Sequence, residues 1–193
     1  MKLMVILGSV REGRAGETVA KWVNKIVEAD PRFELDFVDV KELDLPFYNE
    51  PAGGPFTVAT SPKGYRNPKG RAWSDRVAAA DGFLILTAEY NHSLPASLKN
   101  ALDWVGPSWS NKPGSFVCYG WNAGGARAGE HLRGVMGELG ILQIRETVLV
   151  QLGLGFDEKG DPKDVKYNYH LKAVLDHLFS LSAALKQYYK PQE

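Results

Sequence analysis

Hydrophobic residues along the chain occur in two kinds of run, and both predict strands. Residues 3–7, 83–86 and 116–119 are apolar almost throughout. Such runs are typical of strands that are buried on both faces of a sheet. Residues 33–40 and 142–150 instead alternate apolar and polar positions, as strands with one partly solvated face do. We therefore expect five strands, with the two alternating ones at the edges of the sheet.

Four other segments repeat apolar residues at helical spacing: 19–27, 98–105, 132–139 and 171–185. Strands that alternate with helices predict a parallel sheet covered by helices on both faces and joined by right-handed crossovers. With the alternating strands at the edges, the strand order is 2-1-3-4-5, which is the flavodoxin-like order. We therefore predict an α/β, flavodoxin-like three-layer sandwich in which residues 1–193 form a single domain.

The composition is that of an ordinary soluble globular protein, with 44% hydrophobic and 24% charged residues. Because 23 Lys and Arg residues balance 23 Asp and Glu residues, no global field draws the chain to nucleic acid or to an anionic membrane. The first apolar run stops at Gly8, too early for a signal peptide or a membrane span, so we expect a cytoplasmic protein. Cys118, the single cysteine, lies in an apolar run and is expected to be a buried packing residue.

Residues 48–71 form the least regular stretch and are rich in Pro, Gly, Lys and Arg. Two interpretations remain open: a solvated excursion, or a substrate lid or subunit contact. Lys63, Arg66 and Lys69 would suit the ribose phosphate of a dinucleotide, although plain solvation explains them equally well.

Ligands of such a sheet bind beyond the carboxyl ends of the strands, where the strand order reverses. The loops after residues 7, 86 and 119 should therefore converge. The first, GSVREGRAGET, places hydroxyls, guanidinium groups and backbone N–H groups at a helix start, which together make an anion site. Arg14 and Ala15 stand where a P-loop needs Lys and Ser or Thr, so nucleotide hydrolysis is disfavoured. A strand-to-helix turn without a ligand remains the simpler alternative.

The loop after the third strand reads TAEYNHSLPASLKN. Pro95 favours a helix start with Ser93 as a possible cap, so the backbone N–H groups of residues 89–93 are free to face a ligand and to stabilise negative charge there. Each side chain also has an ordinary interpretation: Glu89 as a solvated acid, His92 as a loop imidazole.

The loop after the fourth strand, YGWNAGGARAGEHLR, has glycines where a planar ligand can approach the backbone closely. Tyr119 and Trp121 add aromatic surface and Arg127 adds a cation. A glycine-permitted turn with aromatic residues over the sheet edge is the alternative.

Other catalytic patterns are missing from the sequence. There is no GxSxG, no HExxH and no cysteine-bearing zinc pattern, which argues against serine hydrolases and metal sites. Asp39, near the end of the second strand, could serve a nucleotide-binding enzyme as a ribose-binding acid, but no GxGxxG accompanies it.

The three loops together resemble those of the NADPH-dependent FMN reductase family, flavodoxin-like proteins that include quinone, azo and chromate reductases. TAEYNHSLPASLKNALDW is the most specific part of the resemblance, although family members usually have Pro where this chain has Ala88. The resemblance implies an FMN whose phosphate lies on the first loop and whose ring lies against the other two. The implied cofactor-binding residues are Ser9, Arg11, Arg14, Gly16, Glu17, Thr18, Ala88, Glu89, Tyr90, Asn91, His92, Tyr119, Gly120, Gly124 and Gly125.

The resemblance also implies an activity. NADPH or NADH reduces the FMN and leaves, and a quinone, azo compound, free flavin or similar small acceptor then takes two electrons in a ping-pong mechanism. No catalytic side chain and no metal is expected, because the cofactor carries the chemistry. A homodimer or homotetramer is implied, with residues 48–71, Trp104 and Trp109 at the contact. The alternative is an FMN-binding electron carrier or redox-sensing partner protein, but such carriers tend to be strongly acidic, and this chain has zero net charge.

Overall fold

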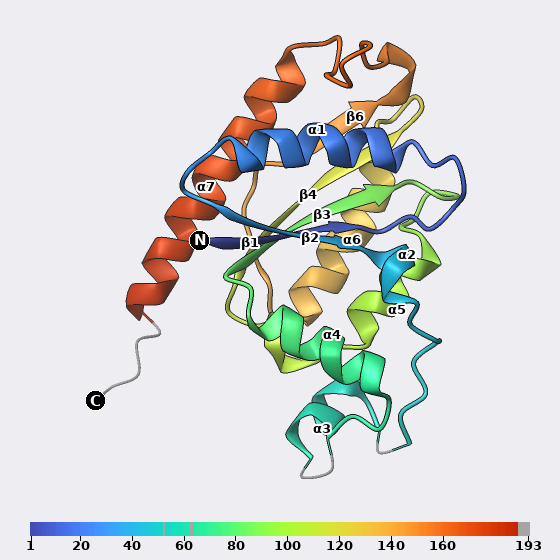
Figure 1. Ribbon diagram of the computed structural model, residues 1–193, viewed down its shortest axis with the longest axis vertical. Helices are drawn as coiled ribbons and strands as arrows, with labels where there is room; N and C mark the ends of the chain where they lie inside the picture. Colours follow the sequence, from blue (N-terminus) through green and yellow to red (C-terminus); the bar gives the residue numbers. More distant parts are fainter. Residues whose placement is uncertain (52, 62–63, 189–193) are drawn as a thin grey trace.

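A parallel sheet forms the centre of the structure, a computed structural model that describes residues 1–51, 53–61 and 64–188. Its strands are β1 (Lys2–Leu7), β2 (Glu34–Asp39), β3 (Gly82–Ala88), β4 (Pro113–Gly120), β5 (Leu142–Gln143) and β6 (Val148–Gln151). The order is β2-β1-β3-β4-β5, and all pairings between these strands are parallel (Figure 1). The predicted flavodoxin-like order is confirmed.

The fifth predicted strand is interrupted. Both β5 and β6 pair with β4, so residues 142–150 follow one edge of the sheet as two short strands. Between them, the Ser115 hydroxyl donates a 2.6 Å hydrogen bond to the carbonyl of Glu146. Because a β4 side chain takes that carbonyl, the backbone ladder stops there and resumes at Val148. The prediction of one continuous strand is wrong in this respect.

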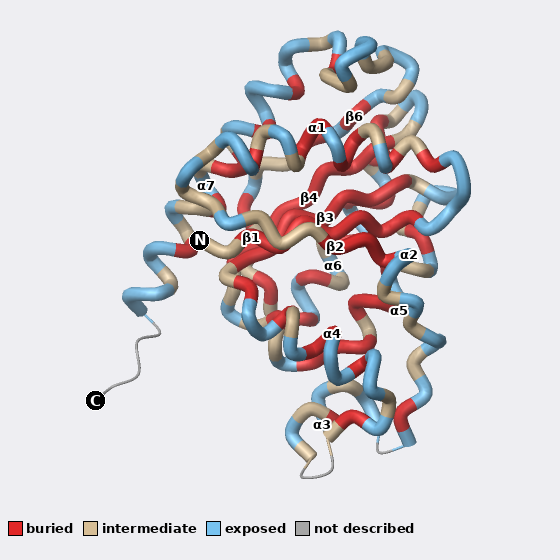
Figure 2. The backbone as a smooth tube through the Cα atoms, viewed as in Figure 1, coloured by how far each residue is buried: buried red, intermediate tan, exposed pale blue. Residues whose placement is uncertain are grey.

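Helices cover both faces of the sheet. One face carries α1 (Gly16–Glu28) and α7 (Lys166–Tyr188), and the other carries α4 (Pro68–Ala78), α5 (Ala96–Asp103) and α6 (Ala126–Glu138). Shorter helical segments are α2 (Val40–Leu43), α3 (Pro55–Thr60) and the 3-10 turns Pro107–Trp109 and Leu152–Leu154. Alternate side chains of β1 enter the two cores, and Figure 2 shows the central strands buried along their length.

The irregular stretch 48–71 is more ordered than its composition suggests. It contains α3 and the start of α4, where Asn67 accepts hydrogen bonds from the N–H groups of Lys69 and Gly70, directly before Pro68. The Lys69 ammonium pairs with Asp44, and Lys63 lies outside the described residues.

Trp104 and Trp109 are fully buried within this one chain. The expectation that they lie at a subunit contact is therefore wrong: Trp104 packs against Tyr48, and Trp109 packs between Trp73 and Phe83. Within the described part of the chain, even the longest helix, α7, lacks the continuous apolar length needed to cross a bilayer.

Candidate functional site

Three loops meet at the carboxyl ends of β1, β3 and β4, on the right of Figure 1. The hydroxyls of Ser9 and Tyr90 are 2.7 Å apart and link the first loop to the second. The Glu89 N–H donates to the Tyr119 carbonyl and links the second loop to the third. The predicted convergence of the three loops is therefore present.

A cavity of about 370 Å³ lies between these loops. Of the residues implied by the sequence, those that line it are Ser9, Arg11, Arg14, Ala88, Glu89, Tyr90, Tyr119, Gly120 and Gly125. Outside the lining lie Gly16, Glu17 and Thr18, in the first turn of α1, and Asn91, His92 and Gly124, on the second and third loops. Trp121 and Arg127, which the sequence suggested as aromatic surface and a cation, also line the cavity. The remaining lining residues are not among the implied cofactor-binding residues: Ala15, Asn122, Ala123 and Leu152.

Arg14 is buried in the first loop and is held by an ion pair. Its guanidinium donates two hydrogen bonds to the Asp39 carboxylate, one to the Ser9 carbonyl and one to Glu17. The hydrogen bonds with Asp39 raise the pKa of Arg14 above its ordinary value, so it stays charged. Asp39 also accepts from the Lys41 N–H at the start of α2, so its oxygens are already occupied. This arrangement fixes the shape of the loop and leaves Asp39 little capacity to bind a ribose.

Arg11, by contrast, lines the cavity with an exposed side chain. Within the described residues it has no ion-pair partner. A free guanidinium beside a helix start is well placed to bind an anion. Arg11 is therefore the stronger of the two candidates for a phosphate contact.

Tyr119 and Leu7 pack so closely against the start of α1 that only glycine fits at position 16. A Cβ at Gly16 would overlap the Tyr119 hydroxyl and lie 2.7 Å from Leu7 Cδ1. Tyr119 is 3% exposed, and its hydroxyl has no hydrogen-bond partner among the described residues. Burial raises the pKa of Tyr119, so the hydroxyl stays protonated and can donate. An unsatisfied buried donor at the base of the cavity suits a site that binds a polar ligand group.

The second loop turns through two residues with left-handed backbone, Asn91 (φ 49°) and His92 (φ 70°). The turn is closed by hydrogen bonds from the Tyr90 N–H to the Ser93 carbonyl and from the Ser93 N–H to the Tyr90 carbonyl. The backbone N–H groups of residues 89–93 were all expected to face a ligand. Three of the five, those of Glu89, Tyr90 and Ser93, instead donate to carbonyls within the protein. Those of Asn91 and His92 remain, since no hydrogen bond from either is found in the described structure.

Ser93 does not cap the helix after it, contrary to expectation. Its hydroxyl lies 3.0 Å from His131 Nδ1, on α6. Helix α5 begins two residues beyond the predicted cap, after Pro95, without a side-chain cap.

Glu89 is a buried acid rather than a solvated one. Its carboxylate, 8% exposed, pairs with the Arg127 guanidinium and accepts the Arg127 N–H at the first turn of α6. Burial works to raise the pKa of Glu89, but the hydrogen bonds from Arg127 outweigh it and hold the pKa below its ordinary value. Glu89 therefore remains charged and fixes α6 against the second loop.

The third loop contains glycines that its own packing against the sheet requires, while the approach of a planar ligand to them stays a prediction. Gly124 (φ 57°) and Gly125 (φ 84°) both have left-handed backbone, and a Cβ at Gly125 would lie 2.7 Å from the Tyr119 backbone nitrogen. The loop therefore presents bare backbone to the cavity, with Trp121 at its rim.

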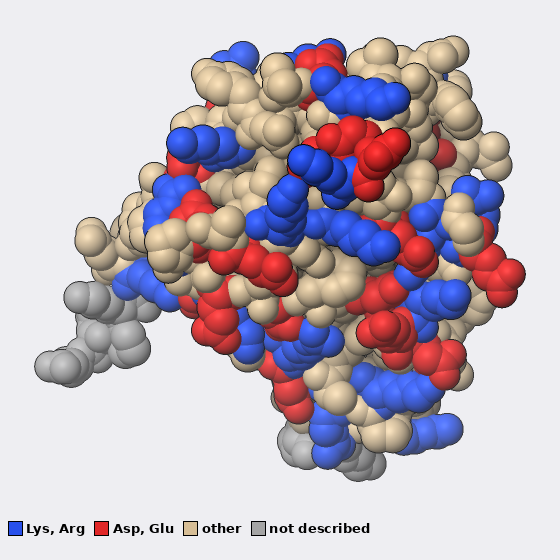
Figure 3. All heavy atoms as spheres, turned by 45° about the horizontal axis from the view of Figure 1, so that its top comes forward, with Lys and Arg blue, Asp and Glu red and all other residues tan. Residues whose placement is uncertain are grey.

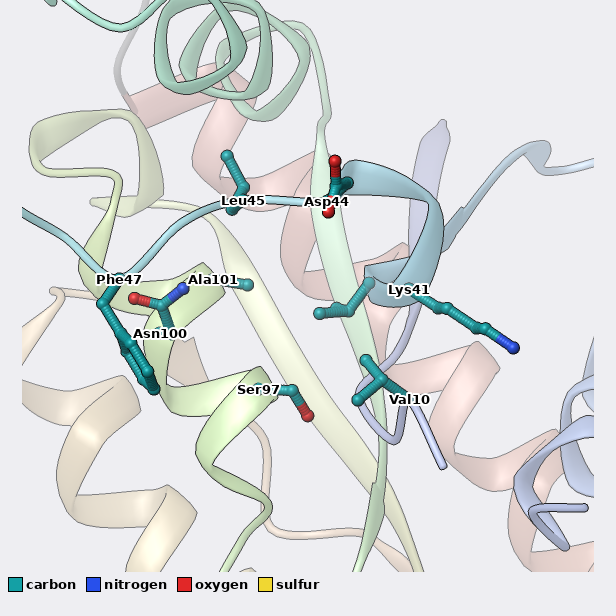
Figure 4. A pocket seen from close by; sticks show the side chains of 9 residues that line it. Val10, Lys41, Asp44, Leu45, Phe47, Ser97, Asn100 and Ala101 are labelled. Carbon is teal, nitrogen blue, oxygen red and sulfur yellow. The ribbon is translucent and has the colours of Figure 1, made fainter. Parts of the chain in front are cut away.

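A second groove, of about 510 Å³, lies beyond the first loop (Figure 4). Its floor is α5, with Ser97, Asn100 and Ala101, and its walls carry Val10 and Phe47. The Asn100 side chain is bonded to the Tyr48 N–H and the Pro46 carbonyl, so the groove offers few free polar groups. The sequence contained no signal for it.

The residues of the cavity fit an FMN. The lining of the cavity combines the free Arg11 guanidinium and Ala15, directly before α1, with glycine backbone and aromatic side chains. The unsatisfied Tyr119 hydroxyl is consistent with a ligand that supplies an acceptor. In the described residues, no group of three or more His, Cys, Asp or Glu side chains could hold a metal ion.

Comparison with known proteins agrees with this geometry. The family model described as NADPH-dependent FMN reductase matches residues 1–154. An NAD(P)H-dependent FMN reductase from Schizosaccharomyces pombe is 38% identical over 137 residues, which cover 70% of this chain and 66% of that protein. The chain thus spans slightly less than two thirds of that relative's length. A 2-hydroxy-1,4-benzoquinone reductase from a Burkholderia species is 36% identical over 152 residues, covering 76% of this chain and 75% of the relative.

Solved structures support the fold. FerB from Paracoccus denitrificans, a flavoenzyme NAD(P)H:(acceptor) oxidoreductase, superposes with a TM-score of 0.74 at 24% identity, covering 95% of this chain and 97% of FerB. At that identity the likeness establishes the flavodoxin-like architecture and nothing finer.

Proposed function

The chain belongs to the NADPH-dependent FMN reductase family, and from this premise we propose that it is an FMN-dependent NAD(P)H oxidoreductase that passes two electrons to a quinone, azo compound, free flavin or similar acceptor. The observation that carries the proposal is the meeting of three loops around one cavity, whose lining includes an unpaired guanidinium, two glycines and aromatic side chains. When bound, FMN supplies the redox chemistry, taking a hydride equivalent from NAD(P)H and giving two electrons to the acceptor.

The first loop binds the phosphate in this proposal. Arg11 and the N–H of Gly16 contact it, and Arg14 holds the loop in place through Asp39. Glu17 and Thr18, in the first turn of α1, lie behind that phosphate in this proposal. Because Arg14 and Ala15 replace the P-loop Lys and Ser or Thr, the phosphate is held and not transferred.

The second and third loops bind the ring. Gly120 and Gly125 let it approach the backbone, and the Asn91 and His92 N–H groups are the donors left to stabilise negative charge on it. No side-chain nucleophile or general base is needed. A site open at its mouth accepts the donor and then the acceptor in turn, which is the ping-pong order.

Two further parts of the proposal do not rest on the geometry of the site. The first, a homodimer or homotetramer as the working form, rests on the family resemblance. The second, a cytoplasmic location, comes instead from the expectation drawn from the sequence. On the face shown in Figure 3, acidic and basic side chains are interspersed, so that face does not present the single-sign field expected for docking a charged protein partner. This favours a small-molecule acceptor over a protein partner.

FMN titration tests the proposal. We expect the purified protein to bind added FMN at one equivalent per chain, followed by quenching of flavin fluorescence. FMN retained no better than by an unrelated protein would reject the assignment.

A further inference from the structure

Trp121 differs from the other four tryptophans of the chain. Trp22, Trp73, Trp104 and Trp109 are at most 2% exposed, and each donates a hydrogen bond through its indole N–H. Trp121 is 74% exposed. Among the described residues, its indole has no hydrogen-bond partner and no ring contact. Its N–H and most of its ring surface are therefore free.

The backbone beside Trp121 is anchored. The carbonyl of Asn122 accepts a 2.8 Å hydrogen bond from the side chain of Gln151, the last residue of β6. Gly124 packs so tightly on Leu149 that a Cβ there would lie 3.1 Å from the Leu149 carbonyl carbon. The third loop thus anchors the backbone that carries the indole beside the cavity.

Trp121 lines the mouth of the cavity and not its base. Tyr119, two residues earlier, lines the same cavity at 3% exposure. A cofactor lying on the base formed by Tyr119 and Gly120 would leave most of the Trp121 indole uncovered. The indole is then available to a second planar molecule that enters after the cofactor is in place.

We propose that Trp121 selects the electron acceptor, by stacking on flat molecules with two or more fused rings. This inference rests on the proposed function. Aromatic rings gain from offset stacking in addition to buried area, and both gains grow with the ring area that the guest offers. A two-ring quinone therefore uses the indole more than a one-ring quinone, and an octahedral oxidant such as ferricyanide offers it no ring face.

The kinetic test compares three oxidants: 2-methyl-1,4-naphthoquinone, 1,4-benzoquinone and ferricyanide. We expect Trp121→Ala to raise KM for the naphthoquinone about two- to tenfold, as the loss of one aromatic contact should. The effect on benzoquinone is smaller, and ferricyanide is unaffected. Trp121→Phe, which keeps a smaller ring, falls between Trp121→Ala and the unaltered protein.

A binding measurement supplies a readout that does not depend on turnover. Isothermal titration of the naphthoquinone into oxidised, FMN-loaded protein without NAD(P)H should show the same loss of affinity in Trp121→Ala. The matched control is Tyr169→Ala on α7, because Tyr169 is also 74% exposed but lies outside the cavity lining. It should leave all three oxidants and the titration unchanged.

Three results would overturn the inference. An equal change for all three oxidants, or no change, would remove acceptor selection from Trp121. If Trp121→Ala lost FMN affinity by as much as it lost naphthoquinone affinity, the indole would be a cofactor contact instead. A raised KM for NADPH alone would assign it to the donor. If FMN does not bind the unaltered protein, the proposed function fails as well. If FMN binds normally and Trp121→Ala affects all three oxidants equally or not at all, only this inference is rejected.

Discussion

Arg11 and Arg14 stand three residues apart in the first loop but have different surroundings. Arg11 is exposed at the cavity, whereas Arg14 is buried against Asp39. We expect Arg11→Ala to weaken FMN binding by about 1.5–3 kcal/mol, because a charge-assisted contact is lost, and to leave the melting temperature nearly unchanged. FMN titration and thermal unfolding measure the two effects, and unchanged FMN affinity would remove Arg11 from the site.

Arg14→Ala should instead lower the stability of the fold, because Arg14 pairs with a buried carboxylate. It leaves the Asp39 carboxylate buried and unpaired, which costs about 3–5 kcal/mol. Denaturant unfolding of the cofactor-free protein checks this. The double variant Arg14→Ala with Asp39→Ala should recover part of the loss, because it leaves no unpaired charge. A double variant that shows the full sum of the two single losses would contradict a direct pairing.

Tyr119 offers a third residue-scale prediction, because its buried hydroxyl has no partner in the described structure. Tyr119→Phe should leave the cofactor-free protein as stable as before, or more stable, because no hydrogen bond is lost. It should weaken FMN binding about two- to tenfold if the cofactor supplies the missing acceptor. Tyr167→Phe is the matched control, since Tyr167 is equally buried but accepts from the Gln151 N–H. A destabilised Tyr119→Phe variant would mean that the hydroxyl has a partner.

Among the elements, the second loop and α6 are coupled through Glu89. Because the folded-state pKa of Glu89 is held below its ordinary value, its contribution to stability is complete above the unfolded-state pKa and is lost as the pH falls through the folded-state pKa. We expect Glu89→Gln to cost about 1–3 kcal/mol at neutral pH and progressively less in acid. Urea unfolding across the pH range measures this.

Glu130→Gln is the control for that series, because Glu130 lies on α6, the helix that Glu89 contacts, but is 75% exposed. Its unfolding curve should stay close to that of the unaltered protein at every pH. If the free energy of unfolding of Glu89→Gln differed from that of the unaltered protein by the same amount at every pH, the coupling between the second loop and α6 would be refuted.

The spacing of apolar residues correctly predicted whether a segment is a strand or a helix wherever that spacing was regular. The runs in β1, β3 and β4 and the helical stripe of α1 were predictable because burial alone sets them. Helix α4 was missed because Pro, Lys, Gly and Arg fill its first turn, and only a few positions such as Trp73 and Val77 face the core. The break between β5 and β6 depends on the Ser115 side chain from another strand, which no local pattern contains.

At the scale of the whole molecule, the sequence predicted where the site lies better than how it is held. Parallel strands end at the same edge, so the convergence of the three loops followed from the strand order. The pairings of Arg14 with Asp39 and of Glu89 with Arg127 join residues 25 and 38 positions apart. Tertiary structure alone reveals such contacts, and they change which donors are free for a ligand.

The whole-molecule claim is that the folded chain, loaded with FMN, is an enzyme and not a carrier. Anaerobic mixing of the FMN-loaded protein with NADPH, followed by mixing with a quinone, tests it most directly. The account predicts rapid loss of the visible flavin absorbance in the first step and its rapid return in the second, with both steps at least as fast as steady-state turnover. Bound FMN that NADPH and NADH reduce only slowly, or that the quinone does not reoxidise, would contradict it.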